Sequence, residues 1–102
     1  MGYEIHYTPT CRTMLAAIQQ PHRRAVLERI QRLATDPEKQ GKPLMGPLRG
    51  HRSIHVSRFR VIYRVVRSRV EVIVLAAGIR KEGSRDDVYE LARRLVRDFS
   101  GE

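Results

Sequence analysis

The sequence has little of what would mark several familiar classes of protein. Its single cysteine, Cys11, can form no disulfide within the chain and supplies too few thiolates for a cysteine zinc site. No apolar run approaches the ~18 residues that cross a bilayer, and the first ten residues, MGYEIHYTPT, lack the apolar centre of a signal peptide. We therefore expect a soluble, cytoplasmic protein that has no membrane partner, no metal site and no need of a disulfide.

Acidic residues are scarce where basic residues are most frequent. The chain has 20 Lys and Arg against 11 Asp and Glu, which gives a formal charge of +9. Residues 49–80 contain eight arginines and one acidic residue, Glu71, so this segment alone carries +7. An arginine-biased genome could explain why 17 of the 20 basic residues are arginine, but it does not explain their clustering. Guanidinium groups suit bidentate contacts with phosphate, so the pattern predicts a polyanionic partner.

The first half of the chain predicts one strand and two helices. At 102 residues the chain is expected to form a single domain over 1–102. Alternation over residues 3–7 predicts a strand. The i, i+3, i+4, i+7 spacing of an apolar stripe then predicts a short helix that ends near residue 20, and Pro21 suits the start of a second helix. The first stripe consists of Cys11, Met14, Leu15 and Ile18, and the second of Val26, Leu27, Ile30, Leu33 and Ala34.

The second half predicts three strands and a last helix. Residues 35–50 hold three of the seven glycines and three of the five prolines, which marks a long connection. Strands are expected at about 52–57, 59–66 and 70–77, joined by short hairpins. Ser84 and Asp87 resemble a capping box before a helix whose buried stripe is Val88, Leu91, Ala92, Leu95 and Phe99. The order β-α-α-β-β-β-α predicts an α+β fold, a compact antiparallel sheet with helices on one face.

The arginines of the central strand fall on one face. Alternation over 59–66 puts Arg60 and Arg64 opposite the apolar set that begins with Phe59. The polar residues Ser53 and His55 can lie beside them, so we expect a solvent-exposed basic face. Its charge could serve solubility alone, which is the simpler reading for Arg64 and for the turn residues Arg67 and Arg69.

Three residues are better candidates for a site. Arg60 and Arg80 lie at strand ends, where binding sites are commonly built, and Arg80 follows a glycine at which the chain can turn sharply. Neighbouring positive charges should lower the pKa of His55, which leaves the imidazole available as an acid or base near neutral pH. His51 and His55 are four residues apart, a spacing that does not converge on a metal when the residues lie along a strand.

The ordered segments DPEKQGKPLMGPLRG, FRVIYRV, VEVIVLAAGIR and DVYELARRL resemble the RelE/ParE superfamily of toxins from bacterial type II toxin-antitoxin systems. The resemblance extends from about residue 3 to residue 96 and implies the compact sheet-and-helix fold expected above. RelE-like members are metal-independent, cofactor-free endoribonucleases that cut mRNA, usually in the ribosomal A site beside 16S rRNA. ParE-like members instead inhibit DNA gyrase. Either branch implies a cognate antitoxin, with an acidic, amphipathic segment that covers the basic surface.

Residue by residue, the resemblance favours the RNase branch. It implies that Tyr89 is the general base, that Arg60 and Arg80 bind the scissile phosphate, and that His55 is the candidate acid. The family usually has two basic residues where this chain has Ser53 and His55, so Arg49, Arg52, Arg58 and Arg64 are expected to supply the remaining RNA contacts. A ParE-like gyrase inhibitor and an inactive nucleic-acid-binding homologue remain the alternatives.

Overall fold

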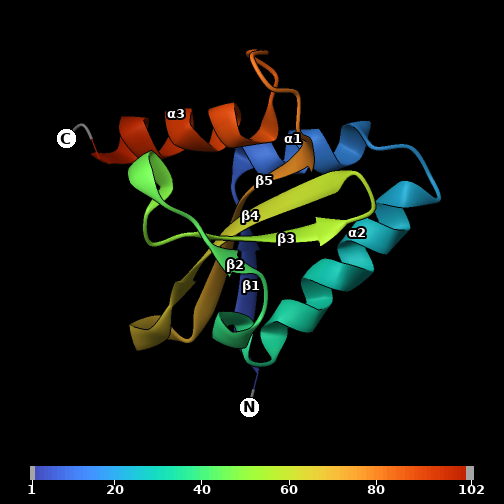
Figure 1. Ribbon diagram of the computed structural model, residues 1–102. Coiled ribbons are helices and arrows are strands. Elements are labelled where there is room, and N and C mark those ends of the chain that lie inside the picture. Colours follow the sequence, from blue (N-terminus) through green and yellow to red (C-terminus); the bar gives the residue numbers. More distant parts are fainter. Residues whose placement is uncertain (1, 101–102) are drawn as a thin grey trace.

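A five-stranded sheet runs through the centre of the molecule (Figure 1), in a computed structural model that describes residues 2–100. The strands are β1 (Glu4–Tyr7), β2 (Lys42–Pro43), β3 (Arg52–Val56), β4 (Phe59–Val66) and β5 (Glu71–Ile79), in the spatial order β1-β5-β4-β3-β2. The helices are α1 (Pro9–Ala17), α2 (His22–Gln31) and α3 (Val88–Ser100). No helix within the described residues is long and apolar enough to span a membrane. The α+β fold is confirmed, and the predicted elements occur in the predicted order.

The sheet is mixed, whereas the sequence predicted an antiparallel one. The three strands from β3 to β5 are antiparallel, as their short hairpins require. The first strand, however, pairs in parallel with β5, with Glu4 opposite Glu71. The structure also adds β2, a two-residue edge strand in the long connection. Both differences have one cause, because the direction of a strand and the presence of a very short one depend on distant partners that local spacing does not reveal.

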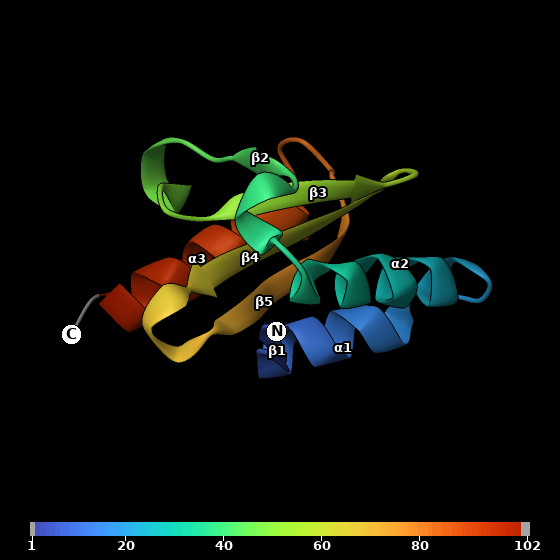
Figure 2. The same cartoon turned by 90° about the horizontal axis from the view of Figure 1, so that it is seen from below.

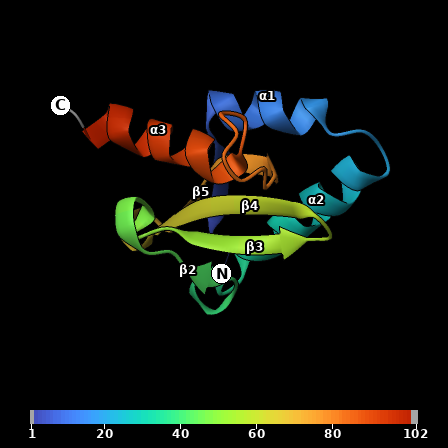
Figure 3. The ribbon, with the colours of Figure 1, turned by 45° about the horizontal axis from the view of Figure 1, so that its top comes forward.

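Helices cover both faces of the sheet, which corrects the expectation that they share one face (Figure 2). On one face the buried core joins α1 and α2 to the strands. On the other face α3 packs through Val88 and Ala92 against Ile62 and Ala76 of the sheet, so the basic face is partly covered (Figure 3). The expected α3 stripe is correct at Val88 and Ala92, while Leu91 and Leu95 are only half-buried. The side chain of Phe99 lies outside the described residues.

A β-bulge interrupts the pairing of β4 with β5. Ile62 lies opposite Ala76, but its neighbour Tyr63 lies opposite Val74, so Leu75 is the extra residue. Thr8 caps the start of α1 by accepting the Cys11 N–H at 3.0 Å, and its hydroxyl donates to the Leu75 carbonyl at 2.7 Å. The bulge therefore has a fixed partner at the start of the first helix.

The long connection is fastened to the sheet by Tyr63 and Arg52. The buried Tyr63 hydroxyl lies 2.8 Å from the carbonyl oxygens of both Pro37 and Gln40. Arg52 donates from Nε to the Gln40 carbonyl at 2.8 Å and from its terminal nitrogen to the Gly41 carbonyl at 3.2 Å. These contacts hold the connection that delivers the chain to β3.

Neither hairpin turn contains glycine or asparagine, the residues that most readily adopt a positive φ. Ser57 adopts φ 55° in the turn from β3 to β4, and Val70 adopts φ 53° in the turn from β4 to β5. A β-branched residue such as Val70 is strained in this left-handed region. The sequence left the geometry of these turns undetermined, and in the structure one residue of each turn takes the left-handed conformation.

Candidate functional site

Four strand and helix ends meet at one corner of the sheet. The register pairs His55 of β3 with Arg60 of β4, and Arg60 in turn with Gly78 of β5. Arg80 follows directly after β5, and Tyr89 lies in the first turn of α3. We call His55, Arg60, Arg80 and Tyr89 the corner cluster. The structure thus brings together the four residues that the sequence assigned to catalysis.

Tyr89 is contacted from two sides. The Arg80 guanidinium carbon lies 5.5 Å from the centroid of the Tyr89 ring, which is within the range of a cation–π contact. At the other end of the ring, the Tyr89 hydroxyl oxygen lies 3.2 Å from Oγ of Ser53. Ser53 is only 3% exposed. The phenol is therefore half-buried, with a cation beside its ring and a buried hydroxyl beside its oxygen.

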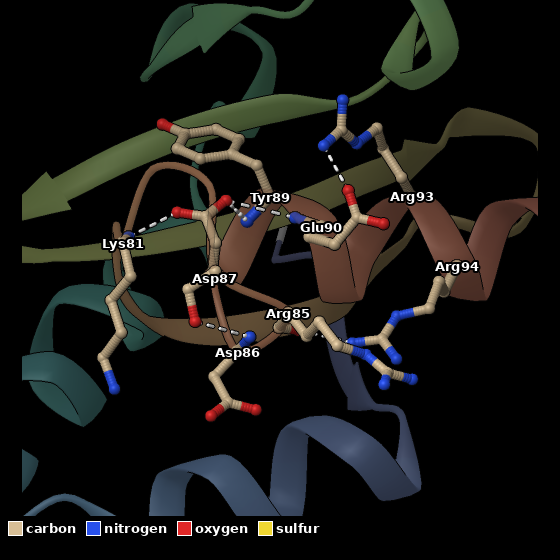
Figure 4. A network of polar contacts seen from close by, with 9 residues as sticks. Lys81, Arg85, Asp86, Asp87, Tyr89, Glu90, Arg93 and Arg94 are labelled. Atoms are coloured by element: carbon tan, nitrogen blue, oxygen red, sulfur yellow. Dashed lines mark hydrogen bonds and ion pairs between the residues drawn. The ribbon is translucent and has the colours of Figure 1, made fainter.

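Asp87 links the two chain segments that carry Arg80 and Tyr89 (Figure 4). One carboxylate oxygen accepts the Lys81 N–H at 2.5 Å. The other accepts the N–H groups of Tyr89 at 3.0 Å and of Glu90 at 3.2 Å. The predicted capping box is therefore wrong in detail. Asp87 itself caps the start of α3, and its carboxylate also contacts the chain at the exit of β5. Ser84 Oγ accepts instead from the Asp86 N–H, at 3.1 Å.

The corner cluster is strongly cationic. The pKa of His55 is lowered, first because the imidazole is partly desolvated and then because the charges of Arg60, Lys42 and Arg80 oppose protonation. Arg60 donates weakly to the carbonyl oxygens of Phe59 and Ser57, at 3.3 and 3.4 Å. Its buried Nε has no hydrogen-bond partner within the described part of the chain. Three cations thus surround one imidazole, and the terminal nitrogen of Arg60 makes only long hydrogen bonds.

One carboxylate already pairs with a member of the corner cluster. Glu82 lies 2.7 Å from a terminal nitrogen of Arg80, and the two side chains are 76% and 52% exposed. Exposed pairs of this kind are weak, so an incoming anion can compete for Arg80.

The four residues expected to bind RNA are dispersed. Arg64 lies further along β4. The pKa of His51 is lowered chiefly by burial and to a smaller extent by the charge of Arg64. Arg49 is exposed after the 46–48 turn. Arg52 is committed to the carbonyl oxygens described above, and Arg58 lies 5.7 Å from the Phe59 ring centroid at the hairpin tip. The structure therefore brings none of these four arginines into the corner cluster.

Two hollows flank the cluster. A cavity of about 260 Å³ is lined by Lys42, Ser53 and His55, among other residues. A larger one, of about 520 Å³, lies towards α1 and is lined by groups such as Met14 and Ile79 but by no member of the corner cluster. The corner cluster therefore lies on an open surface rather than in an enclosed pocket.

Potential metal ligands gather elsewhere. Glu4, His6 and Glu71 form the one such group found within the described residues, at the start of β1 and β5. His6 Nε2 lies 2.7 Å from Glu4 Oε1 and 3.4 Å from Glu71 Oε2, so the histidine contacts both carboxylates. This group lies at the opposite end of β5 from Arg80.

Comparison with known families identifies the scaffold. The model of the ParE toxin of type II toxin-antitoxin systems, parDE, matches residues 5–82. This chain belongs to the ParE toxin family. The predicted membership of the RelE/ParE superfamily is thereby confirmed. The matched region of this toxin ends before α3, so it includes Arg80 but not Tyr89. No curated protein matches the sequence.

Solved structures of similar fold come from both branches of the superfamily. The toxin-antitoxin complex RelBE2 from Mycobacterium tuberculosis matches with a TM-score of 0.73 and 28% identity, covering 78% of this toxin and 93% of that chain. A mutant of the E. coli toxin RelE in the free state matches with a TM-score of 0.75 and 20% identity, covering 93% and 98%. The chromosomal ParDE system from P. aeruginosa matches with a TM-score of 0.63 and 17% identity, covering 76% and 95%.

The sequence did not reveal the contacts of two residues of the candidate site. It placed Ser53 on a solvent-exposed face and as a departure from the family pattern, whereas Ser53 is buried, and it indicated Asp87 only as part of a helix cap. A signal existed for each, because Ser53 shares a strand face with His55 at i, i+2 and Asp87 precedes Tyr89 by two residues. Neither spacing identifies the hydrogen-bond partner.

Proposed function

We propose that this toxin is a metal-independent endoribonuclease that cleaves mRNA by attack of a 2'-hydroxyl on the scissile phosphate. One observation carries the proposal: a tyrosine, two arginines and a histidine from separate elements meet at the corner of the sheet. RNA cleavage without a metal needs a base, an acid and donors for the charged transition state, and these side chains can supply all three.

Tyr89 is assigned the role of base. The Arg80 guanidinium carbon lies 5.5 Å from the centroid of its ring, so the proposed base stands beside a proposed phosphate-binding group. In the proposed step the phenolate takes the proton of the 2'-hydroxyl while the 2'-oxygen forms a bond to phosphorus.

Arg60 and Arg80 are assigned to the phosphate. Both guanidinium groups can donate to the non-bridging oxygens, whose negative charge increases in the pentavalent transition state. The long hydrogen bonds of the Arg60 terminal nitrogen and the weak, exposed partner of Arg80 leave donors available for this contact. The P–O5' bond then breaks, which leaves a 2',3'-cyclic phosphate and a 5'-hydroxyl.

His55 is assigned as the acid that protonates the leaving 5'-oxygen. Its lowered pKa means that the free imidazole is mostly neutral at pH 7. A bound phosphate would offset the charges of Arg60, Lys42 and Arg80, so RNA binding should raise the pKa of His55 towards its ordinary value. Cleavage by the wild type should then slow as the pH rises above neutrality, and this limb should disappear in His55→Ala.

The proposed partners follow from the same surface. We infer an mRNA substrate presented by the ribosome near 16S rRNA, a cytoplasmic location, and a cognate antitoxin that neutralises the basic face. The exposed Arg49 and Arg64 are retained as proposed RNA contacts outside the corner cluster. Several similar structures are complexes of a toxin with its antitoxin, which supports the last of these partners.

The test compares Tyr89→Phe and Arg80→Ala with the wild type in single-turnover cleavage of a translated message, mapped by primer extension. Loss of proton transfer typically reduces the rate by ~10² to 10⁴-fold, and we expect a loss of that size for Tyr89→Phe. Tyr3→Phe and Arg67→Ala are matched controls away from the corner cluster. If Tyr89→Phe, with an unchanged circular dichroism spectrum, cleaves at the wild-type rate, Tyr89 is not the base.

Inhibition of DNA gyrase is the second candidate, because the matched family model is that of ParE. Expression of the toxin distinguishes the two functions. An endoribonuclease depletes mRNA with specific 5' ends, whereas a gyrase inhibitor produces DNA breaks and leaves messages intact. A toxin that does neither would be the inactive homologue.

A further inference from the structure

Ser53 is a buried hydroxyl at the edge of the corner cluster. It lies in β3 opposite Ile62 of β4 and Lys42 of β2, so neighbouring strands hold its backbone on both sides. Within the described residues, the one hydrogen-bond partner of its Oγ is the Tyr89 hydroxyl, at 3.2 Å. A buried hydroxyl without a partner is costly, so this contact has an energetic reason to persist.

Tyr89 is consequently held at both ends. Asp87 accepts its backbone N–H at 3.0 Å at the start of α3. Ser53 contacts its phenol oxygen from the sheet, across the face that α3 covers. Asp87 thus fixes the backbone of Tyr89 at the start of the helix, and Ser53 fixes the position of its hydroxyl group. A hydroxyl fixed in this way has less freedom to point away from a substrate placed at Arg80.

We propose that Ser53 is a positioning residue that orients the Tyr89 hydroxyl and donates its own hydrogen to the phenolate once Tyr89 has lost its proton. This inference rests on the proposed role of Tyr89 as the base. In the neutral pair either oxygen can donate, but a phenolate can only accept, so the Ser53 hydroxyl must then be the donor. A hydrogen bond to an ionised acceptor is shorter and stronger than one between neutral groups.

Ser53 acts on Tyr89 alongside several charged groups. Arg80 faces the ring from the end of β5, His55 and Arg60 approach from β3 and β4, and Lys42 lies on β2 opposite Ser53. These groups stay in place whether or not Ser53 is present. Removal of the serine hydroxyl should therefore slow cleavage without abolishing it.

The test follows Tyr89 directly, by NMR of protein labelled with ¹³C at the tyrosine ζ carbon, with Tyr89→Phe to assign its signal. In Ser53→Ala we expect the Tyr89 signal to shift, because the carbon that bears the phenol oxygen reports the loss of the hydrogen bond to that oxygen. Single-turnover cleavage should slow about tenfold at unchanged RNA affinity. Ser53→Thr, which keeps a hydroxyl, should recover both properties.

Controls separate this inference from the function on which it rests. Ser68→Ala, in the distant β4–β5 turn, should change neither property, and Ser53→Cys, with a similar volume and a weak donor, replaces Ser53→Ala if the latter does not fold. A Tyr89 signal and a cleavage rate that are the same in the wild type and in the folded variant overturn the role of Ser53. Full activity of Tyr89→Phe overturns the role of Tyr89 as base instead, while the NMR signal of the wild type still reports on the contact with Ser53.

Discussion

Replacement of Asp87 by alanine should destabilise the fold and disorganise the corner cluster together. The carboxylate is 7% exposed and accepts three backbone N–H groups, two at the start of α3 and one at Lys81 beside Arg80. One side chain thereby joins the exit of β5 directly to the helix that carries Tyr89. Loss of the carboxylate should free the two segments from one another.

The size of the effect follows from these contacts. Replacing a helix-capping aspartate by alanine typically costs about 1 kcal/mol. A hydrogen bond from a backbone N–H to a charged acceptor contributes about 1.5 to 3 kcal/mol, so loss of the Lys81 contact adds a similar or larger amount. The total of about 2 to 4 kcal/mol corresponds to a fall in Tm of roughly 10 to 20 °C for a domain of this length.

Differential scanning calorimetry and single-turnover cleavage measure the two consequences on the same samples. Asp86→Ala is the matched control, because Asp86 is exposed and adjacent in sequence. Asp87→Asn, which keeps one acceptor oxygen for the helix cap, should fall between the control and Asp87→Ala. The reasoning is refuted if Asp87→Ala melts within about 3 °C of the control. If the Tm falls but the folded protein cleaves RNA normally, Asp87 supports the helix without positioning the site.

Two further predictions concern groups around the cluster. Glu82→Gln should release Arg80 for phosphate and tighten RNA binding by up to about five-fold at low salt, with a smaller gain at high salt. Fluorescence anisotropy measures this affinity. Weaker binding by the variant would show that Glu82 is needed to hold Arg80. Burial lowers the pKa of His51, so its neutral form is favoured in the folded state, and stability should decrease as the pH falls below about 6.5 towards that lower value. Urea unfolding at several pH values should show that stability decreases less steeply with falling pH in His51→Gln. A decrease as steep as in the wild type would exclude His51 as its cause.

Features set by neighbouring residues could be predicted from the sequence. The stripe of Cys11, Leu15 and Ile18 is buried against the sheet, and Pro21 directly precedes α2. The bounds of β4 agree with the expected 59–66. The pairing of His55 with Arg60 follows from the short turn between their strands. In each case the spacing along the chain determines the contact.

Features set by distant partners could not be predicted in this way. The parallel pairing of β1 joins residues about 67 positions apart, and the face on which α3 packs depends on the path of the loop before it. Arg52 illustrates the same limit in the site. Its charge and its position on the strand suited RNA, yet the carbonyl oxygens of Gln40 and Gly41 occupy its guanidinium, and no local pattern announces such partners.

The extra residue at Leu75 shifts the alternation of side chains along β5 by one position. Val72 and Val74 belong to the core under α1 and α2, and uninterrupted alternation would direct residues 76, 78 and 80 to that same face. The bulge reverses the parity, so Ala76 packs under α3 and Arg80 emerges beside Tyr89. A deletion or insertion of one residue in this strand would therefore carry Arg80, which the proposed mechanism assigns to the phosphate, to the opposite side of the sheet without substituting any residue of the corner cluster.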